Sequence, residues 1–185
     1  MEIDRARAAR VRLVALDVDG VLTDNGIWIG PIAGERVELK RFDIQDGLGM
    51  RLLGTAGIPV LWLSGRHSEA TVMRAEELGV DEVLQVEGPR KLESLAKVLS
   101  RRGLGWDEVA YVGDDLADLQ IMRRVGLPIA VANAVPEIRQ VAAATTTARG
   151  GYGAVREVAD ALLQARGVWG DMLERYFTEP TRQDA

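Results

Sequence analysis

The chain has no cysteine among its 185 residues. A disulfide framework and a thiolate metal site are therefore both excluded, and any bound metal has to be held by oxygen. Long apolar runs are also absent. The first ten residues are charged and hold no signal-peptide core, and no stretch approaches the ~20 apolar residues that span a bilayer. We expect a cytoplasmic protein without a membrane partner.

The sequence also lacks an excess of positive charge. Its 23 basic side chains are outnumbered by 28 acidic ones, which gives a formal net charge of −5, and no basic stripe stands out. A nucleic-acid partner is therefore not expected. With 47% apolar and 28% charged residues, the composition is that of an ordinary globular protein. At this length it predicts one sizeable core and a single domain over residues 1–185.

Short apolar runs alternate with helical patterns along the chain. Leu92, Leu95 and Leu99 recur at the spacing of an amphipathic helix, and Gly103 suits its C-terminal cap. Such alternation predicts an α/β fold with a doubly wound, Rossmann-like parallel sheet covered on both faces. The predicted strands are 11–16, 58–63, 82–86, 109–112 and 129–132, with further helices around 68–78, 116–122 and 155–163.

Two segments depart from this alternation. Within residues 25–45, short β-type runs at 27–29 and 37–39 flank a stretch rich in glycine, which predicts a β-hairpin inserted after the first strand. Residues 167–185 include several aromatic and apolar side chains, too many for a free tail, so we expect part of this segment to dock on another surface.

The most informative residues follow the first predicted strand. Asp17 and Asp19 are two apart on an extended backbone, so their side chains point the same way. In parallel sheets, ligands bind beyond the carboxyl ends of the strands, which is where these two residues are expected to lie. Two neighbouring carboxylates need either a shared proton or a cation, and a divalent metal fits better. Taken alone, however, Asp-x-Asp-Gly is equally typical of a turn after a strand.

Further polar side chains follow other predicted strands. Ser64 and Gly65 come after the second strand, Asp114 after the fourth, and Lys91 opens a helix between them. A carboxylate that attacks a phosphoryl group must first lose the repulsion between two anions, which Mg²⁺ clamped by further carboxylates removes. Phosphoryl oxygens also need fixed donors, and Ser64 and Lys91 supply a hydroxyl and a cation. This set predicts a magnesium-dependent phosphoryl site.

In their order along the chain these motifs resemble those of the haloacid dehalogenase-like phosphatases. The resemblance runs from residue 11 to about 166 and covers DVDGVLT at 17–23, SGR at 64–66, a lysine at 91 and GDDLAD at 113–118. It implies phosphoryl transfer, because family members that cleave carbon–halogen bonds do not need the second aspartate as an acid.

The resemblance also implies residue roles. Asp17 is expected to be the nucleophile that becomes an aspartyl-phosphate. Asp19 is expected to protonate the leaving alcohol and then to activate water. Mg²⁺ would be held by the side chains of Asp17 and Asp114 and by the main-chain carbonyl of Asp19, while Ser64, Gly65 and Lys91 bind the phosphate.

Roles are also predicted for three further polar residues. Asp118 is expected to orient the metal ligands without binding the metal itself. Asp115 has the same predicted role or, as an equally good alternative, complements a helix dipole. His67, the single histidine, is either an exposed residue at a helix start or a substrate contact.

The segments around the motifs leave no room for a lid domain. This capless arrangement resembles the branch that dephosphorylates 3-deoxy-D-manno-octulosonate 8-phosphate, whose members form tetramers in which neighbours complete each site. The resemblance implies a homotetramer and a small sugar-acid phosphate as substrate. Because that substrate carries a carboxylate, cations should gather at the pocket. The expected substrate contacts are Arg66, His67, Arg149, Arg156 and Asp46.

Three alternatives stay open. Similar domains act on nine-carbon sugar-acid phosphates. A phospho-receiver domain also places aspartates and a lysine at strand ends, but its phosphorylated aspartate lies on a later strand and its lysine comes last. A catalytically silent sugar-binding or oligomerisation module has no need of an acid at Asp19.

Overall fold

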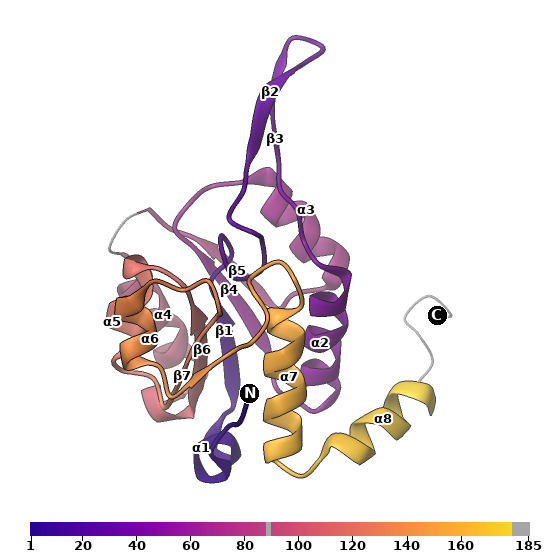
Figure 1. Cartoon of the computed structure of the whole chain (residues 1–185), viewed down its shortest axis with the longest axis vertical. Coiled ribbons are helices and arrows are strands. Elements are labelled where there is room, and N and C mark those ends of the chain that lie inside the picture. The colour runs from indigo at the N-terminus through magenta and orange to yellow at the C-terminus, as the bar shows by residue number, and fades with distance from the viewer. Residues whose placement is uncertain (88–89, 179–185) are drawn as a thin grey trace.

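The structure, a computed structural model, describes residues 1–87 and 90–178. A six-stranded parallel sheet in the order β5-β4-β1-β6-β7-β8 forms its centre (Figure 1). The helices α2 and α7 pack together on one face, and α4, α5 and α6 cover the other. This architecture confirms the predicted doubly wound α/β fold. The strands of the sheet are β1 Leu13–Leu16, β4 Val60–Ser64, β5 Glu82–Gln85, β6 Val109–Gly113, β7 Leu127–Ala130 and β8 Ala144–Thr145.

The central strand β1 is the point where the direction of winding changes. From β1 the chain moves outward through β4 to β5, and it then returns to β6 on the other side of β1. Ligands of such sheets bind beyond the carboxyl ends of the strands at this point. The helices that connect and flank the strands are α1 Arg5–Arg10, α2 Ile44–Thr55, α3 Glu69–Leu78, α4 Lys91–Arg102, α5 Leu119–Met122, α6 Pro136–Val141, α7 Ala154–Ala165 and α8 Trp169–Thr178.

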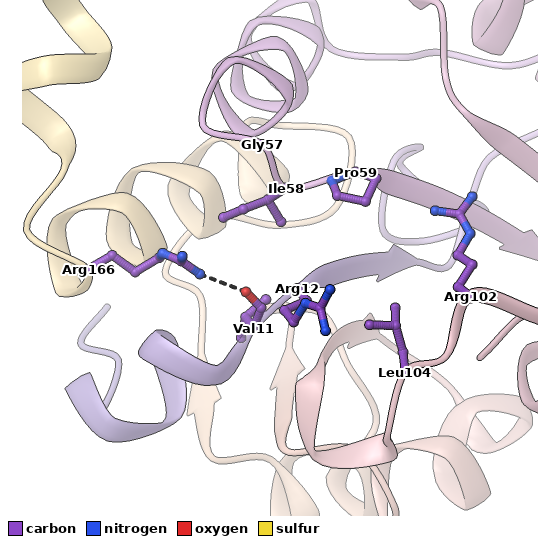
Figure 2. A pocket seen from close by; sticks show the side chains of 8 residues that line it. All are labelled: Val11, Arg12, Gly57, Ile58, Pro59, Arg102, Leu104 and Arg166. Carbon is purple, nitrogen blue, oxygen red and sulfur yellow. Dashed lines mark hydrogen bonds between the residues drawn. The ribbon is translucent and has the colours of Figure 1, made fainter. Parts of the chain in front are cut away.

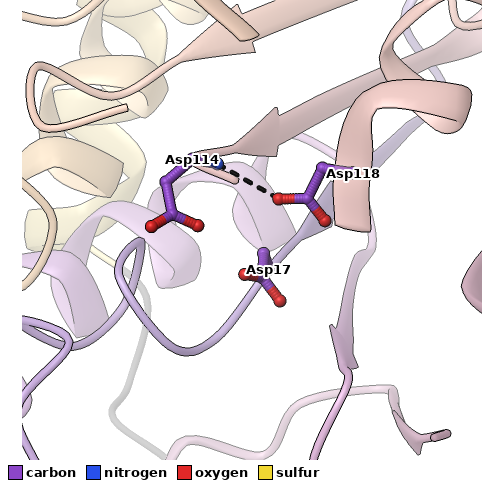
Figure 3. A group of neighbouring side chains, drawn as sticks. All are labelled: Asp17, Asp114 and Asp118. Atoms are coloured by element: carbon purple, nitrogen blue, oxygen red, sulfur yellow. Dashed lines mark hydrogen bonds between the residues drawn. The ribbon is translucent and has the colours of Figure 1, made fainter. Parts of the chain in front are cut away.

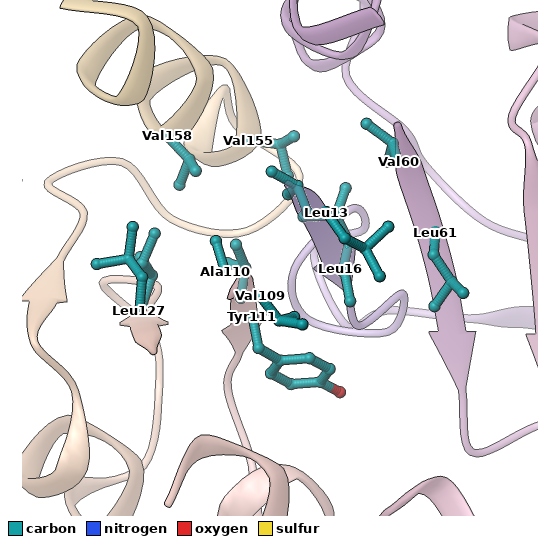
Figure 4. Packing of buried hydrophobic residues seen from close by; sticks show 14 of the residues in the cluster. Leu13, Leu16, Val60, Leu61, Val109, Ala110, Tyr111, Leu127, Val155 and Val158 are labelled. Atoms are coloured by element: carbon teal, nitrogen blue, oxygen red, sulfur yellow. The ribbon is translucent and has the colours of Figure 1, made fainter. Parts of the chain in front are cut away.

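Both faces of the sheet are apolar, which explains the unbroken hydrophobic runs of β1, β4 and β6. The side chains of Leu13, Leu61, Val155 and Val158 are fully buried in this core (Figure 4). Tyr111 on β6 is also fully buried and turns its hydroxyl toward the carboxyl ends of the strands, where it serves the site described below. The core therefore holds β1 and β6 rigidly beneath that site.

Helix α2 was not predicted from the sequence. Its sequence contains Gly47, Gly49 and Gly54, which weaken helix propensity by ~1 kcal/mol each relative to alanine. Packing explains at least one of them, because a Cβ on Gly49 would lie 2.9 Å from the Cα of Arg156 on α7. The glycine thus lets the two helices approach closely, and tertiary contact outweighs the local preference.

The predicted hairpin is present as β2 Trp28–Ile32 and β3 Glu35–Leu39, which pair antiparallel and project from the body of the molecule (Figure 1). Ala33 and Gly34 both have positive φ values, 53° and 87°, as a tight two-residue hairpin turn requires. Several large apolar side chains on the hairpin are exposed, among them Trp28 at 57%.

Other elements differ from the predictions at their boundaries. The first strand begins at Leu13 rather than at residue 11, and the strand predicted at 129–132 lies at Leu127–Ala130. The short elements α6 and β8 were not predicted, since neither is long enough to show a period. Within residues 1–87 and 90–178, no helix has both the length and the apolar character needed to cross a membrane.

The segment expected to dock forms α8. Met172 of this helix is buried, whereas Phe177 is 79% exposed. The helix lies near α2 and α7. Residues 179–185 of the predicted tail fall outside the described residues.

Candidate active site

The loop after β1 is folded tightly around its aspartates. The hydroxyl of Thr23 accepts hydrogen bonds from the backbone N–H groups of Gly20 and Asn25, at 3.2 and 3.3 Å. Gly20 has a φ of +93°, and a Cβ there would lie 2.7 Å from the carboxyl carbon of Asp114. Glycine is therefore required at this position both by backbone conformation and by the close approach of Asp114.

Three buried carboxylates meet at the ends of β1 and β6. Asp17, Asp114 and Asp118 each offer an oxygen, and these oxygens lie within 4.8 Å of one another. Their side chains point toward a common space (Figure 3). Like charges so close and so well buried disfavour full ionisation unless a cation joins them. Of the residues predicted to lie together, the structure brings these three into one cluster.

Lys91, the first residue of α4, lies between two members of this cluster. Its side chain is 3% exposed, and Nζ donates to Oδ1 of Asp17 at 2.6 Å and to Oδ1 of Asp118 at 2.9 Å. Burial alone would lower the pKa of Lys91, but the charges of Asp17 and Asp118 outweigh it and raise the pKa. Lys91 thus places positive charge beside the expected nucleophile.

Asp118 is fully engaged by hydrogen bonds. Oδ1 accepts from the Tyr111 hydroxyl at 2.7 Å as well as from Lys91, and Oδ2 accepts from the backbone N–H of Asp114 at 3.1 Å. Tyr111 is a residue that the sequence analysis missed, because a tyrosine inside an apolar strand has the pattern of a core residue. These bonds allow Asp118 to hold Lys91 and the Asp114 backbone in place.

Asp114 has spare ligand capacity. Its Oδ1 is buried and has no hydrogen-bond partner among residues 1–87 and 90–178. Burial, followed by the charge of Asp118, raises the pKa of Asp114 to about 7. Burial and the charge of Asp118 also raise the pKa of Asp17 well above its usual value. A hard divalent cation binds carboxylate oxygens of this kind, so the donor set fits Mg²⁺.

The side chain of Asp19 is not a member of the three-carboxylate cluster. Its Oδ1 lies 2.7 Å from Nζ of Lys40, a lysine whose side chain is fully buried. The predicted metal contact of Asp19 was through its main-chain carbonyl, which leaves the side chain available for other chemistry. Lys40 is a second residue that sequence reasoning missed, since a single lysine after a hairpin strand carries no motif.

Ser64 and Gly65 lie beside Lys91 at the end of β4. The Ser64 hydroxyl accepts from the backbone N–H of Arg66 at 3.1 Å and donates to the Arg66 carbonyl at 3.0 Å. A Cβ on Gly65 would lie 3.6 Å from Cε of Lys91. The expected phosphate-binding residues are therefore neighbours, and the hydroxyl is held by its own loop.

The expected substrate contacts do not form one group. Arg66 is paired with Glu38 of the hairpin, with Nη2 2.9 Å from Oε2, and His67 is exposed. Arg149 is exposed as well and lines a pocket of about 370 Å³ together with Asp24 and Tyr152. Arg66 and His67 follow β4, whereas Arg149 lies on the loop before α7.

Asp46 and Arg156 lie where α2 meets α7. Asp46 is 1% exposed and accepts a hydrogen bond from the backbone N–H of Arg156 at 2.8 Å, within the first turn of α7. Burial raises the pKa of Asp46 to about 6. The Arg156 side chain bonds to Asp160 at 2.7 Å. The structure therefore gives Asp46 a helix-capping contact, which the sequence analysis did not foresee.

Asp115 lies outside the cluster. It is exposed, and its Oδ1 accepts from the backbone N–H of Leu116 at 2.7 Å at the start of a short 3-10 turn. This position matches the helix-terminal alternative that the sequence left open for Asp115.

Asn133 joins two loops at the edge of the site. Its Nδ2 donates to the carbonyl of Gly20 at 2.9 Å, and its Oδ1 accepts from the backbone N–H of Gly150 at 2.6 Å. The loop that carries the aspartates is thereby bonded to the glycine-rich loop that carries Arg149.

A second pocket, of about 400 Å³, lies at the opposite edge of the sheet (Figure 2). Three arginines line it, but each already has a partner. Arg166 donates to the carbonyl of Val11 at 2.6 Å, and Arg12 and Arg102 form ion pairs with glutamates at 3.2 and 3.0 Å. Because its arginines are already paired, this pocket does not offer the charged groups that are found at the carboxyl ends of the strands.

Comparisons with known proteins agree with this geometry. Residues 68–155 match the model of the haloacid dehalogenase-like hydrolases. The chain is 43% identical over 162 residues to the 3-deoxy-D-manno-octulosonate 8-phosphate phosphatase KdsC of Escherichia coli strain K12, which covers 88% of this chain and 84% of that protein. It is 41% identical to the KdsC of Yersinia pestis, over 86% of this chain and 83% of that protein.

Solved structures resemble the chain as well. The crystal structure of the 3-deoxy-D-manno-octulosonate 8-phosphate phosphatase from Moraxella catarrhalis, in complex with magnesium ion, phosphate ion and a KDO molecule, aligns with a TM-score of 0.87 and 36% identity. The alignment covers 93% of this chain and 97% of that one. The fold, the ordered motifs and these relatives together lead to one conclusion: the chain belongs to the haloacid dehalogenase-like hydrolase family.

Proposed function

We propose that the protein is a Mg²⁺-dependent phosphatase that hydrolyses 3-deoxy-D-manno-octulosonate 8-phosphate to the free sugar acid and phosphate. The observation that carries this proposal is the buried cluster of Asp17, Asp114 and Asp118 with Lys91 set into it. The relatives described above are named for this activity, and the Moraxella catarrhalis structure holds magnesium, phosphate and KDO.

The residues present can hold the magnesium ion. Asp17 and the unpartnered oxygen of Asp114 offer carboxylate ligands, and the main-chain carbonyl of Asp19 is the third expected donor. When bound, Mg²⁺ offsets the negative charge shared by the carboxylates and the substrate phosphate. Asp118 supports this site through its hydrogen bond to the Asp114 backbone.

The chemistry begins at Asp17. A carboxylate oxygen of Asp17 attacks phosphorus and forms an aspartyl-phosphate, while the bond from phosphorus to the sugar oxygen breaks. Asp19 gives a proton to that departing oxygen, so the sugar leaves as a neutral alcohol. Lys91, 2.6 Å from the nucleophile, supplies positive charge next to the reacting group.

The second half of the reaction releases phosphate. Asp19, now ionised, takes a proton from water, and the water oxygen attacks phosphorus as the bond to Asp17 breaks. Both half-reactions therefore use the same carboxyl group, first as an acid and then as a base. The step restores Asp17 and leaves Asp19 protonated for the next cycle.

Recognition of the sugar acid calls for cations around the cluster. Arg149 lines the pocket of about 370 Å³ and is exposed, so its guanidinium is accessible to a carboxylate. Arg66 lies at the end of β4 close to Lys91 but is paired with Glu38. We assign substrate contact to Arg149 and Arg66 in this proposal, with His67 beside them.

A substrate panel tests the proposed function. The full chain is assayed for phosphate release with 3-deoxy-D-manno-octulosonate 8-phosphate, a nine-carbon sugar-acid 9-phosphate and glucose 6-phosphate at one magnesium concentration. We expect selective turnover of the eight-carbon acid and loss of activity with a chelator, restored by added Mg²⁺. Equal turnover of glucose 6-phosphate, or full activity in excess chelator, would contradict the proposal.

We further propose that the chain works in the cytoplasm as a homotetramer in which neighbouring subunits close the site. The hairpin supports this proposal because its two strands expose several large apolar side chains, and gathered apolar surface of this kind marks an interaction site. These are Trp28, Ile29, Ile32 and Leu39, each between 51% and 59% exposed. Residues 1–87 and 90–178 contain no lid domain that would otherwise exclude water from an aspartyl-phosphate.

Placing a charge on the hairpin tests the assembly. Trp28→Glu is expected to shift the protein from a tetramer to smaller species in light scattering, because a buried carboxylate at an apolar interface is costly. Ile44→Glu is the matched control, since Ile44 is 83% exposed and belongs to α2 rather than to either hairpin strand. A wild-type protein that is monomeric and fully active would overturn this assignment.

A further inference from the structure

Lys40 is a buried lysine beside the active site that no motif explains. It follows β3, where the hairpin returns to the body of the molecule, and its side chain is 0% exposed. Burying an ammonium group is costly unless it is paired and hydrogen-bonded. The groups around Lys40 therefore indicate why it is there.

Lys40 Nζ is held by three groups. Oδ1 of Asp19 lies 2.7 Å away, Oε1 of Glu38 lies 3.7 Å away, and the hydroxyl of the fully buried Thr71 on α3 accepts a hydrogen bond at 3.3 Å. The shortest of these contacts is the one to Asp19. The ammonium is thus anchored by α3 and by the hairpin strand, and it presents its charge to one particular carboxylate oxygen.

The ion pair with Lys40 restrains the orientation of the Asp19 carboxylate. The loop that carries Asp19 continues through Thr23, whose backbone bridges to Phe42 just after Lys40, so the two segments are also joined through the main chain. Oδ1 forms the ion pair with Lys40, and Oδ2 is the oxygen that we assign to proton exchange with a bound ester or a water. A freely rotating carboxylate would reach the reacting oxygen only part of the time.

We propose that Lys40 is a positioning residue that holds the Asp19 carboxylate for its proton transfers in phosphate-ester hydrolysis. The inference rests on the proposed function, because it needs Asp19 to be the acid and base of that reaction. Lys40 itself does not touch the reacting atoms. It acts through Asp19, whereas Lys91 acts on the nucleophile and the phosphate.

The test compares two esters that differ in their need for a proton. The sugar-acid 8-phosphate would have to release an unstable alkoxide unless an acid protonates the leaving oxygen, whereas p-nitrophenyl phosphate releases a stabilised anion that needs no proton. We expect Lys40→Met to lower kcat/KM for the sugar phosphate by about 10- to 100-fold and for p-nitrophenyl phosphate by less than about threefold. Lys40→Arg should recover part of the loss.

A double-mutant cycle with Asp19→Asn provides the second readout. Once Asp19 can no longer transfer a proton, Lys40→Met should cost less than about threefold more in sugar-phosphate turnover. Lys97→Met, which removes an exposed lysine on α4 whose side chain is 73% exposed, is the matched control and should match wild type.

Each remaining outcome overturns the inference. Equal losses for both esters, or a Lys40→Met effect that multiplies fully with that of Asp19→Asn, would mean that Lys40 acts on the fold or on the phosphate rather than on Asp19. A wild-type protein that hydrolyses neither ester would instead count against the proposed function, so the two failures are distinguishable.

Discussion

Asp17→Asn is expected to lower phosphate release by at least about 10⁴-fold, the largest effect of any single substitution in this chain. The amide is nearly the same size as the carboxylate but is not a nucleophile, so no aspartyl-phosphate can form. It also removes the negative partner of Lys91, whose Nζ lies 2.6 Å from Asp17. Initial rates of phosphate release measure the loss, and acid quenching of the wild-type reaction should trap the phosphorylated protein.

Asp115→Asn is the matched control for Asp17→Asn. Asp115 lies next to Asp114 in sequence, but it is exposed and bonds only to the start of a 3-10 turn. Its amide variant should retain a rate within about threefold of wild type, since surface substitutions of this kind have small effects. Wild-type turnover by Asp17→Asn would end the assignment of the nucleophile.

Asp19→Asn is expected to reduce turnover of the sugar phosphate by ~100-fold or more, because both half-reactions lose their proton-transfer group. The fold and magnesium binding should persist, since the Asp19 side chain lies outside the cluster of Asp17, Asp114 and Asp118. Steady-state rates measure the first effect. Thermal unfolding with and without Mg²⁺ measures the second, because a ligand that binds the native state raises the unfolding temperature.

The comparison with Asp17→Asn sharpens this second prediction. A variant at Asp19 should still form the aspartyl-phosphate slowly with p-nitrophenyl phosphate, whose leaving group needs no acid, whereas a variant at Asp17 should not form it with any ester. An unchanged rate for Asp19→Asn would place the proton transfer on another group.

Much of the fold could be predicted because the strands are buried on both faces. β1 and β6 are short apolar runs that end in acidic residues, and a sequence of that kind has few other structures available to it. The carboxylate cluster could be predicted as well, because the carboxyl ends of neighbouring parallel strands lie at the same edge of the sheet. Asp17 and Asp114 were expected together on that basis, and they lie within one cluster.

The rest depended on contacts between residues far apart in sequence. Nothing in the local sequence at Gly49 indicates that α7 passes 2.9 Å from where a Cβ would be. Lys40 likewise has no spacing relation to Asp19, and their ion pair exists only because the hairpin returns beside the first strand. Periodicity reports which face of an element is buried but not which element covers it.

The substrate contacts stay predictions. Asp46 was placed among them by resemblance; it is buried on α2, and its carboxylate accepts a hydrogen bond from the backbone N–H of Arg156 in the first turn of α7. An aspartate near a glycine gives the same sequence pattern whether it caps a helix or binds a ligand. Geometry alone separates the two.

Asn133 couples the movements of two loops of the active site. Its amide nitrogen bonds to Gly20 at 2.9 Å and its amide oxygen to Gly150 at 2.6 Å. One side chain therefore connects the segment that holds the nucleophile to the segment that bears Arg149. A sugar acid that draws the Arg149 segment inward would pull on the catalytic segment at the same moment. Capture of the ligand and tightening of the reaction centre would then be a single concerted movement.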